Sequence, residues 1–370
     1  MKLITIVGAR PQFVKAAMVG RAIGRYNRRH GAGAVEERLL HTGQHYDARM
    51  NDVFFRQLDI RPPAWQLQCG QGSHGAMTAR MLEGIERVLL ADRPDAVLVY
   101  GDTNSTLAGA LAAAKLHVPV VHVEAGLRSF NRRMPEEINR VVTDHVSTLL
   151  FCPTTAAVGH LANEGIREGV YHAGDVMYDA ALAFGTLAQQ HSAILTTLHL
   201  APRRFYLATV HRAENTDDRE RLSSIIRALA AVASDDCPVV LPLHPRTRMR
   251  LEEYGLLTAV AGHASFRTTE PVDYLDMVML EKQAAAILTD SGGVQKEAYF
   301  HRTPCVTLRD ETEWTETVDG GWNLLAGHRT ENIVRCLHAH HSIPKTDIAE
   351  YGTGRAADDI VDRLTRLAGE

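Results

Sequence analysis

The sequence predicts an α/β protein built from two Rossmann-like, doubly wound domains, and three observations carry this prediction. Short apolar runs rich in Val and Ile alternate with stretches whose apolar residues recur at helical spacing, which is typical of βαβ units around parallel sheets. This series starts afresh near residue 205, after a helical connector. With 370 residues, of which 45% are hydrophobic, the chain is long enough for two cores. We expect the two domains to face each other across a ligand-binding cleft.

The first domain is predicted to span residues 1–175. Apolar, β-prone runs predict its strands at residues 3–7, 37–41, 96–100, 118–123, 149–152 and 170–172. Apolar residues at helical spacing predict intervening helices, including residues 76–90 and 103–115.

The second domain, residues 176–350, begins with the connector, a helical segment that ends at Pro202. Its strands are predicted at residues 205–210, 238–243, 266–268, 285–289, 305–308 and 323–325, with helices that include 219–233 and 294–300. Residues 351–370 have apolar positions at helical spacing and form a C-terminal helix that could pack back on the first domain.

Charge and composition argue against several kinds of partner. The formal net charge of −4 and the pI near 6.6 give no overall attraction for nucleic acid. No apolar run reaches the ~18 residues of a membrane span. The five cysteines lie far apart without a CxxC pair, and a His-rich stretch at residues 338–341 lacks acidic companions at ligand spacing. We expect a cytoplasmic protein that binds neither membrane nor nucleic acid and has no metal site.

The stretch LTDSGGVQKEAYF, residues 288–300, joins a buried strand directly to a helix. Glycine lets the backbone approach a ligand closely, and the free N–H groups of a helix's first turn suit a phosphate. Ser291, Gly292 and Gly293 are therefore candidate phosphate contacts, and Glu297, about one turn further, could accept hydrogen bonds from sugar hydroxyls. A tight strand–helix connection without a ligand is the alternative.

Charged residues also follow strands of the first half. Arg10 and Lys15 lie in GARPQFVK, which matches neither GxGxxG nor the P-loop. Asp102 in YGDTNST and Glu124 in HVEAGLRS each place a carboxylate beside a glycine at the end of a strand. Asp102 could also be only a helix N-cap, and Arg10 only a solvated charge. The paired carboxylates favour a functional site.

Three further clusters have the same character. Glu136 and Arg140 lie in MPEEINR, where acidic residues also suit a helix N-terminus. His211 in TVHRAEN and His244 in PLHPRT follow strands of the second half. Imidazole and guanidinium groups at such positions can neutralise a diphosphate or move protons near neutral pH.

Taken in chain order, these segments resemble the non-hydrolysing UDP-N-acetylglucosamine 2-epimerase family. The resemblance is carried by GARPQFVKAA, HTGQHYD, YGDTNSTLAGALAA, HVEAGLRS, PEEINR, VHRAEN, PLHPRT and DSGGVQKEA, and it covers nearly the whole chain. It implies the GT-B-like two-domain fold with a UDP-sugar in the cleft. It also implies a homodimer and neither a metal nor a nicotinamide cofactor.

The resemblance further implies a reaction, the inversion of C2 of a UDP-2-acetamido sugar through elimination of UDP and its re-addition to a 2-acetamido-glycal. This chemistry needs a base for the C2 proton, cationic groups for the departing diphosphate and a proton returned to the opposite face. The residues implied to be catalytic are Asp102, Glu124, Glu136 and His211. Those implied to bind substrate are Arg10, Lys15, Arg140, Arg212, Glu214, His244, Ser291, Gly292, Gly293 and Glu297.

The substrate is expected to be UDP-GlcNAc, converted to UDP-ManNAc, because this is the commoner activity of the family. Three departures resemble instead the branch that acts on UDP-2,3-diacetamido-2,3-dideoxyglucuronic acid, an O-antigen precursor. They are Trp314 in place of an arginine, Met277 in place of an aromatic residue, and Asp47 in place of the second Gln of a regulatory segment. Arg128, Arg132 and Arg133 are candidate partners for the carboxylate of such a sugar. A hydrolysing 2-epimerase, a GT-B glycosyltransferase and a non-catalytic UDP-sugar sensor are further alternatives.

Overall fold

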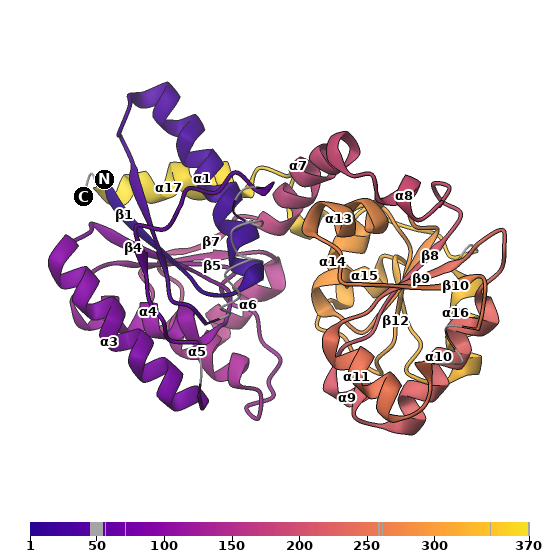
Figure 1. Ribbon diagram of the computed structural model, residues 1–370. Coiled ribbons are helices and arrows are strands. Elements are labelled where there is room, and N and C mark those ends of the chain that lie inside the picture. Colours follow the sequence, from indigo (N-terminus) through magenta and orange to yellow (C-terminus); the bar gives the residue numbers. More distant parts are fainter. Residues whose placement is uncertain are drawn as a thin grey trace. The chain divides into compact units, whose positions relative to one another are not determined.

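The structure is a computed structural model that describes residues 1–44, 55, 57–70, 72–257, 260, 262–340 and 342–368 (Figure 1). Of the segments that carried the resemblance, HTGQHYD therefore lies partly outside the described residues, Asp47 included. The chain divides into two compact units, Met1–Ala180 together with Ala349–Glu370, and Ala181–Ile348. Each unit contains one sheet.

The first unit contains a seven-stranded sheet, and every described strand pairing in it is parallel. Its strands are β1 (Lys2–Val7), β2 (Glu36–His41), β3 (Trp65–Gln66), β4 (Ala96–Tyr100), β5 (Val120–Val123), β6 (Leu149–Cys152) and β7 (Val170–His172). Its helices are α1 (Arg10–His30), α3 (His74–Asp92), α4 (Asn104–Lys115), α5 (Pro135–Val146), α6 (Thr155–Asn163) and α17 (Ala356–Leu364), with the short 3-10 helices η1 (Ala349–Tyr351) and η2 (Thr365–Ala368). The helix α7 (Val176–His191) contains the boundary between the units.

The second unit contains a six-stranded sheet whose described pairings are also parallel. Its strands are β8 (Tyr206–Thr209), β9 (Val239–Pro242), β10 (Phe266–Thr269), β11 (Ala286–Thr289), β12 (Cys305–Thr307) and β13 (Asn323–Leu325). Its helices are α8 (Ile194–Thr197), α9 (Ala213–Thr216), α10 (Arg219–Val232), α11 (Pro245–Glu253), α13 (Tyr274–Gln283), α14 (Gly292–Phe300), α15 (Thr315–Asp319) and α16 (Thr330–Ala339).

The two sheets share one strand order. It is β3-β2-β1-β4-β5-β6-β7 in the first and β10-β9-β8-β11-β12-β13 in the second, so each follows the 3-2-1-4-5-6 order of doubly wound folds. The predicted α/β class with two doubly wound sheets is confirmed. In such sheets, ligands bind outside the carboxyl ends of the strands where the order reverses, which is beside β1 and β4 and beside β8 and β11.

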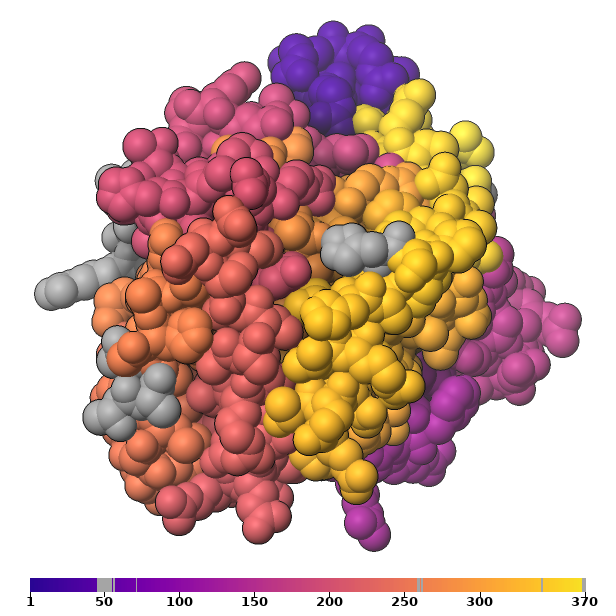
Figure 2. Space-filling view, turned by 90° about the vertical axis from the view of Figure 1, so that its right-hand side faces the viewer, coloured from indigo at the N-terminus to yellow at the C-terminus, as the bar shows by residue number. Residues whose placement is uncertain are grey.

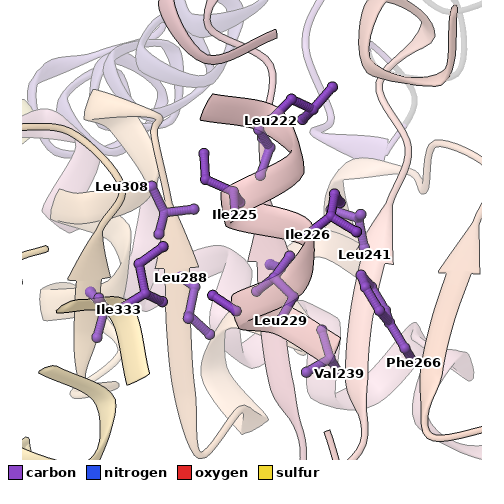
Figure 3. Packing of buried hydrophobic residues seen from close by; sticks show 14 of the residues in the cluster. Leu222, Ile225, Ile226, Leu229, Val239, Leu241, Phe266, Leu288, Leu308 and Ile333 are labelled. Carbon is purple, nitrogen blue, oxygen red and sulfur yellow. The ribbon is translucent and has the colours of Figure 1, made fainter. Parts of the chain in front are cut away.

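The helix α10 illustrates how the sequence specifies these layers. Leu222, Ile225, Ile226 and Leu229 recur at helical spacing, are buried, and point toward the apolar side chains of β9, β10 and β11 (Figure 3). Each such side chain contributes roughly 1.5–3 kcal/mol when it is fully buried. Asp218 caps the helix by accepting hydrogen bonds from two backbone N–H groups of the first turn. Figure 2 shows the coral and orange surface that the elements of this unit present.

The C-terminal helix α17 belongs to the first unit and packs beside α1 (Figure 1). Arg25 on α1 donates two hydrogen bonds of 2.9 Å to the carboxylate of Asp358 on α17. The carboxylate of Asp179, on α7, accepts the backbone N–H groups of Ala356 and Ala357 at the start of α17. Burial raises the pKa of Asp179 to about 6. Among the described residues, no helix has the length and hydrophobicity that a membrane span needs.

Candidate active site

Two strand ends of the first unit place carboxylates beside cations. Asp102 follows β4, and its Oδ2 accepts a hydrogen bond of 2.5 Å from Nη2 of Arg140 on α5. Glu124 follows β5, and its Oε2 pairs with Nζ of Lys15, which is buried on α1. The two turns are adjacent, because a Cβ built on Gly101 would lie 3.1 Å from Oε2 of Glu124 and 3.6 Å from Nζ of Lys15. The structure therefore brings four of the predicted residues together.

The electrostatics of Asp102 suit proton transfer. Burial of the carboxylate raises its pKa, and the charge of Glu124 adds to this effect, whereas Arg140 and Lys15 oppose it. The Asp102 side chain is nevertheless 32% exposed, so a ligand can reach it. A carboxyl group whose pKa is raised toward neutrality can exchange protons more readily at working pH.

The backbone at Glu124 is in an uncommon conformation. Its φ of 72° lies in the left-handed region, which non-glycine residues rarely adopt. The N–H groups of Glu124 and Ala125 both donate to the carbonyl of Phe151 on β6, which helps to hold the turn. Strained backbone of this kind gathers at functional sites, where the surrounding structure supports it.

The other predicted residues of the first unit lie at the surface. Arg10 is the exposed first residue of α1, and Glu136 is exposed in the first turn of α5. The adjacent Glu137 is buried, and its carboxylate accepts the N–H groups of Ser129 and Phe130. The sequence predicted a role for Glu136 alone, whereas in the structure Glu137 holds the loop before α5.

In the second unit, Asp290 organises the strand ends. Its buried carboxylate, directly after β11, accepts the backbone N–H groups of His211 and Arg212 and the side-chain N–H of Asn215. These bonds tie the turn after β8 to the end of β11. Sequence analysis noted Asp290 but assigned it no role, because its partners lie about 80 residues earlier in the chain.

The two predicted histidines lie together. The rings of His211 and His244 have centroids 5.6 Å apart, and His244 also caps α11 by accepting the N–H of Arg246. Burial lowers the pKa of His211, and Arg212 and His244 reinforce this effect against the opposing charge of Asp290. Burial, together with Arg246, likewise lowers the pKa of His244. Both imidazoles are therefore mainly neutral at pH 7.

The predicted phosphate turn opens α14. Ser291 is the N-cap residue and the helix begins at Gly292, two residues before the predicted start. A Cβ built on Gly292 would have no protein atom closer than 3.5 Å, and its neighbours would be Trp314 Nε1, Glu313 Oε2 and Arg212 Nη2. These three side chains surround the first turn of the helix, where the N–H groups suit an anion. The neighbouring Gly293 is exposed.

Two predicted carboxylates of this unit have contrasting surroundings. Glu214 is exposed and accepts a hydrogen bond of 2.6 Å from Nη2 of Arg221. Glu297 lies on α14 near the buried Glu281, whose pKa is raised well above its usual value by burial and by the charge of Glu297. Among the described residues, no group of three or more His, Cys, Asp or Glu side chains could hold a metal ion.

Comparison with known proteins identifies the family. The family model described as UDP-N-acetylglucosamine 2-epimerase matches residues 28–365. The chain belongs to this family. It is 50% identical to a UDP-N-acetylglucosamine 2-epimerase homolog of Methanococcus maripaludis over 99% of this chain and 100% of the relative. It is also 50% identical to the UDP-2,3-diacetamido-2,3-dideoxy-D-glucuronate 2-epimerase of Pseudomonas aeruginosa, with the same coverage.

A solved structure of the family supports the fold. The crystal structure of the Methanocaldococcus jannaschii UDP-GlcNAc 2-epimerase, in complex with UDP-GlcNAc and UDP, has a TM-score of 0.87 and 41% identity. The match covers 99% of this chain and 100% of that one. The two doubly wound sheets are thus those of a GT-B-like epimerase.

The structure shows the surroundings of the residues that were expected to mark the uronate branch of the family. The indole Nε1 of Trp314 is buried without a hydrogen-bond partner among the described residues, and Nζ of Lys296 lies 4.0 Å from the indole ring centroid. Met277 packs against the apolar cluster beneath α13. Arg128 is buried and donates to Asp144 and Glu164, so the expectation that it could bind a sugar carboxylate is wrong.

Proposed function

We propose that this protein inverts C2 of a UDP-2-acetamido sugar without hydrolysing it. The observation that carries this proposal is the pairing of Asp102 and Glu124 at adjacent strand ends, each beside its own cation. A site that only bound UDP would not need two carboxylates there. The family to which the chain belongs adds support, since its members carry the name of this reaction.

The reaction divides into two balanced halves. In the first, a carboxylate takes the C2 proton while the C1–O bond breaks and its electron pair leaves with UDP, which yields a 2-acetamido-glycal. In the second, UDP oxygen re-adds to C1 and C2 receives a proton on the opposite face. Asp102, Glu124 and Glu136 are the proposed proton-transfer groups, and Lys15 and Arg140 tune the first two.

The second unit supplies the proposed contacts for UDP. The first turn of α14, with Ser291, Gly292 and Gly293, would bind phosphate, and Glu297 would bind the ribose. Arg212 supplies positive charge near this turn, and His211 and His244 are the proposed donors of polar hydrogens. Glu214, on α9, is a further proposed substrate contact and would accept hydrogen bonds. A neutral His211 could donate a hydrogen bond to the departing diphosphate. Arg10, exposed at the start of α1, is the remaining proposed substrate contact.

UDP-GlcNAc is the first proposed substrate and the 2,3-diacetamido-uronate the second. The 50% identity to the Pseudomonas aeruginosa relative supports the uronate, and the 50% identity to the relative described as a UDP-N-acetylglucosamine 2-epimerase homolog supports UDP-GlcNAc equally. Both substrates would undergo the same chemistry at C2.

Epimerisation in heavy water tests the proposal. The purified protein should convert one UDP-sugar into its C2 epimer with a single deuterium at C2, because the abstracted proton exchanges before its return. It should need no acceptor, and activity should survive a chelator without added nicotinamide. Release of free sugar and UDP would indicate a hydrolysing 2-epimerase, and turnover only with an acceptor would indicate a glycosyltransferase. Binding of both UDP-sugars without turnover would indicate that the protein is a non-catalytic UDP-sugar sensor.

The same family resemblance supports three finer proposals, namely that the protein is a homodimer, works in the cytoplasm and supplies a polysaccharide or lipopolysaccharide precursor. Sedimentation equilibrium of the purified chain measures the first directly. A monomer at micromolar concentration would contradict it.

A further inference from the structure

The imidazole of His122 lies between two groups that can only accept hydrogen bonds. His122 is on β5 and has no solvent exposure. Its Nδ1 is 2.7 Å from Oδ1 of Asp144 on α5, and its Nε2 is 2.8 Å from the backbone carbonyl oxygen of Gly101. A neutral imidazole carries one ring hydrogen and can satisfy only one of these two acceptors.

The carboxylate of Asp144 is held in its ionised form. Its Oδ2 accepts a hydrogen bond of 2.6 Å from Nη1 of Arg128 and one of 3.1 Å from the backbone N–H of Gly126. Burial alone would raise the pKa of Asp144, but the hydrogen bonds and charges of His122 and Arg128 outweigh burial and lower it. An ionised Asp144 has no hydrogen to donate to Nδ1, so both ring nitrogens of His122 must be donors.

The resulting charges balance inside the unit. His122 and Arg128 are cationic, Asp144 is anionic, and Glu164 accepts two further hydrogen bonds from the same guanidinium. Removal of one member of such a buried network leaves an uncompensated charge, which is strongly destabilising.

This buried pair fastens the two turns that bear the proposed acid–base groups. The carbonyl of Gly101, the residue before Asp102, accepts from His122, while the N–H of Gly101 donates to Val123 on β5. The N–H of Gly126, two residues after Glu124, donates to Asp144. One ion pair therefore bonds directly to the backbone of both turns.

We propose that His122 is a positioning residue, an imidazolium whose two ring N–H groups, with Asp144, fix the turns of Asp102 and Glu124 relative to each other. This inference rests on the proposed function for its catalytic consequence. It does not rest on that function for the charge state of His122.

Ring-nitrogen NMR of histidine-labelled protein tests the charge state. His122 should show two ring N–H signals, because each ring nitrogen faces an acceptor, Oδ1 of Asp144 or the carbonyl oxygen of Gly101. His340 is a matched control, since it is equally buried but only its Nε2 faces a carbonyl, that of Trp322, at 3.0 Å, and its Nδ1 has no partner among the described residues. It should show one signal. A single ring N–H at His122, assigned through bonds in the unaltered protein, would overturn the inference.

Kinetics test the positioning role. His122→Gln should lower kcat by roughly tenfold or more, because a displaced acid–base group loses alignment, while UDP affinity measured by calorimetry changes less than about threefold. His340→Gln should leave kcat unchanged. Unchanged kcat in His122→Gln, or an equal loss of UDP affinity, would contradict positioning. If the unaltered protein does not epimerise, the proposed function fails, and the NMR result still decides the charge state.

Discussion

Single residues decide the proton-transfer chemistry, and Asp102 and Glu124 carry its first prediction. Asp102→Asn or Glu124→Gln should lower kcat by about two or more orders of magnitude, the usual scale for acid–base groups, with a smaller effect on UDP affinity. Glu83→Gln on α3, whose carboxylate is 69% exposed, is the control and should keep normal turnover. Steady-state kinetics with UDP calorimetry would measure both quantities. Near-normal turnover in both site variants would mean that these carboxylates are misassigned.

A second residue-scale prediction concerns the buried pair Glu281 and His301, whose Oε2 and Nε2 atoms lie 4.0 Å apart. Burial raises the pKa of Glu281 well above its usual value, and the charge of Glu297 adds to this effect, whereas burial lowers the pKa of His301 to about 3. The unfolded chain ionises Glu281 above about pH 4.3, whereas the folded chain does not, so stability falls by about 1.4 kcal/mol per pH unit as pH rises.

Glu281→Gln removes this dependence. The free energy of unfolding, measured without ligand by denaturant titration, should therefore rise for the variant relative to the unaltered protein as pH increases above about 5 toward the raised pKa of Glu281. Glu168→Gln, at an exposed position, should show no such trend. A constant difference between Glu281→Gln and the unaltered protein would mean that Glu281 is ionised in the folded state.

The sequence was sufficient to predict which residues lie at the ends of strands, but not which side chains form hydrogen bonds or ion pairs with them. Asp102 and Glu124 are recognisable because each follows an apolar run and a parallel sheet gathers such ends at one edge. The ion pairs of Arg128 with Asp144 and Glu164 could not be predicted from the sequence, because these partners lie 16 and 36 residues away along the chain and meet Arg128 only in the folded unit. The role of His122 was missed for the same reason, although a histidine within an otherwise apolar strand is the signal that could have found it.

At the scale of elements, apolar runs in the sequence predicted the positions of the strands that are buried on both faces. Each of the twelve predicted strands is present, with ends shifted by at most two residues. The exception is β3 (Trp65–Gln66), a two-residue edge strand after two prolines, which is too short to leave a periodic signal. The start of α14 was placed late because glycine lowers helix propensity, although it is tolerated in a first turn that faces a ligand.

The start of α14 gives the element-scale prediction. Gly292→Ala should weaken UDP binding by tenfold or more, on the order of 1.4 kcal/mol, because the methyl group would lie at the first turn, where the backbone must approach a phosphate closely. Thermal stability without ligand should be kept or slightly raised, since the methyl meets no protein atom within 3.4 Å and alanine favours helix.

Gly159→Ala, within α6, is the matched control for this change. A Cβ at this position would meet no atom within 4 Å, whereas one on Gly292 would meet three side-chain atoms at 3.5, 3.7 and 3.9 Å. Gly159→Ala should therefore keep or slightly raise stability and leave UDP affinity unaltered. Calorimetric UDP titration and thermal unfolding of both variants separate the two effects. Unchanged UDP affinity in Gly292→Ala would contradict a phosphate site at this turn.

At the scale of the whole molecule, the repeated 3-2-1-4-5-6 strand order places a reversal in each unit. Asp102 follows β4 at one reversal and Glu124 follows β5 next to it. At the other reversal, His211 and Arg212 follow β8, and the phosphate turn that begins with Ser291 follows β11. The restart of the strand series near residue 205 was enough to predict two sheets, because each sheet needs its own set of buried strands. The sequence could not predict that α17 packs on the first unit, because an apolar helix face does not reveal which surface it covers.

Substrate choice is the last prediction and concerns the whole enzyme. If the uronate is the substrate, the protein should turn it over much faster than UDP-GlcNAc and should not need UDP-GlcNAc as an activator. A cation that meets the C6 carboxylate forms charge-assisted hydrogen bonds worth about 1.5–3 kcal/mol, so its loss costs roughly 10- to 100-fold in rate. Arg132 and Arg133, both exposed in the loop before α5, are the candidates now that Arg128 is occupied.

The double change Arg132→Gln with Arg133→Gln should therefore reduce kcat/KM for the uronate by that factor and leave the rate with UDP-GlcNAc within about threefold. Arg28→Gln with Arg29→Gln is the matched control, because it removes the same charge from two adjacent exposed arginines at the end of α1. Rates with both UDP-sugars, each with and without UDP-GlcNAc as effector, decide the question. Faster turnover of UDP-GlcNAc by the unaltered protein would reject the uronate, because a site that binds a C6 carboxylate leaves its cation unpaired beside a neutral hexose.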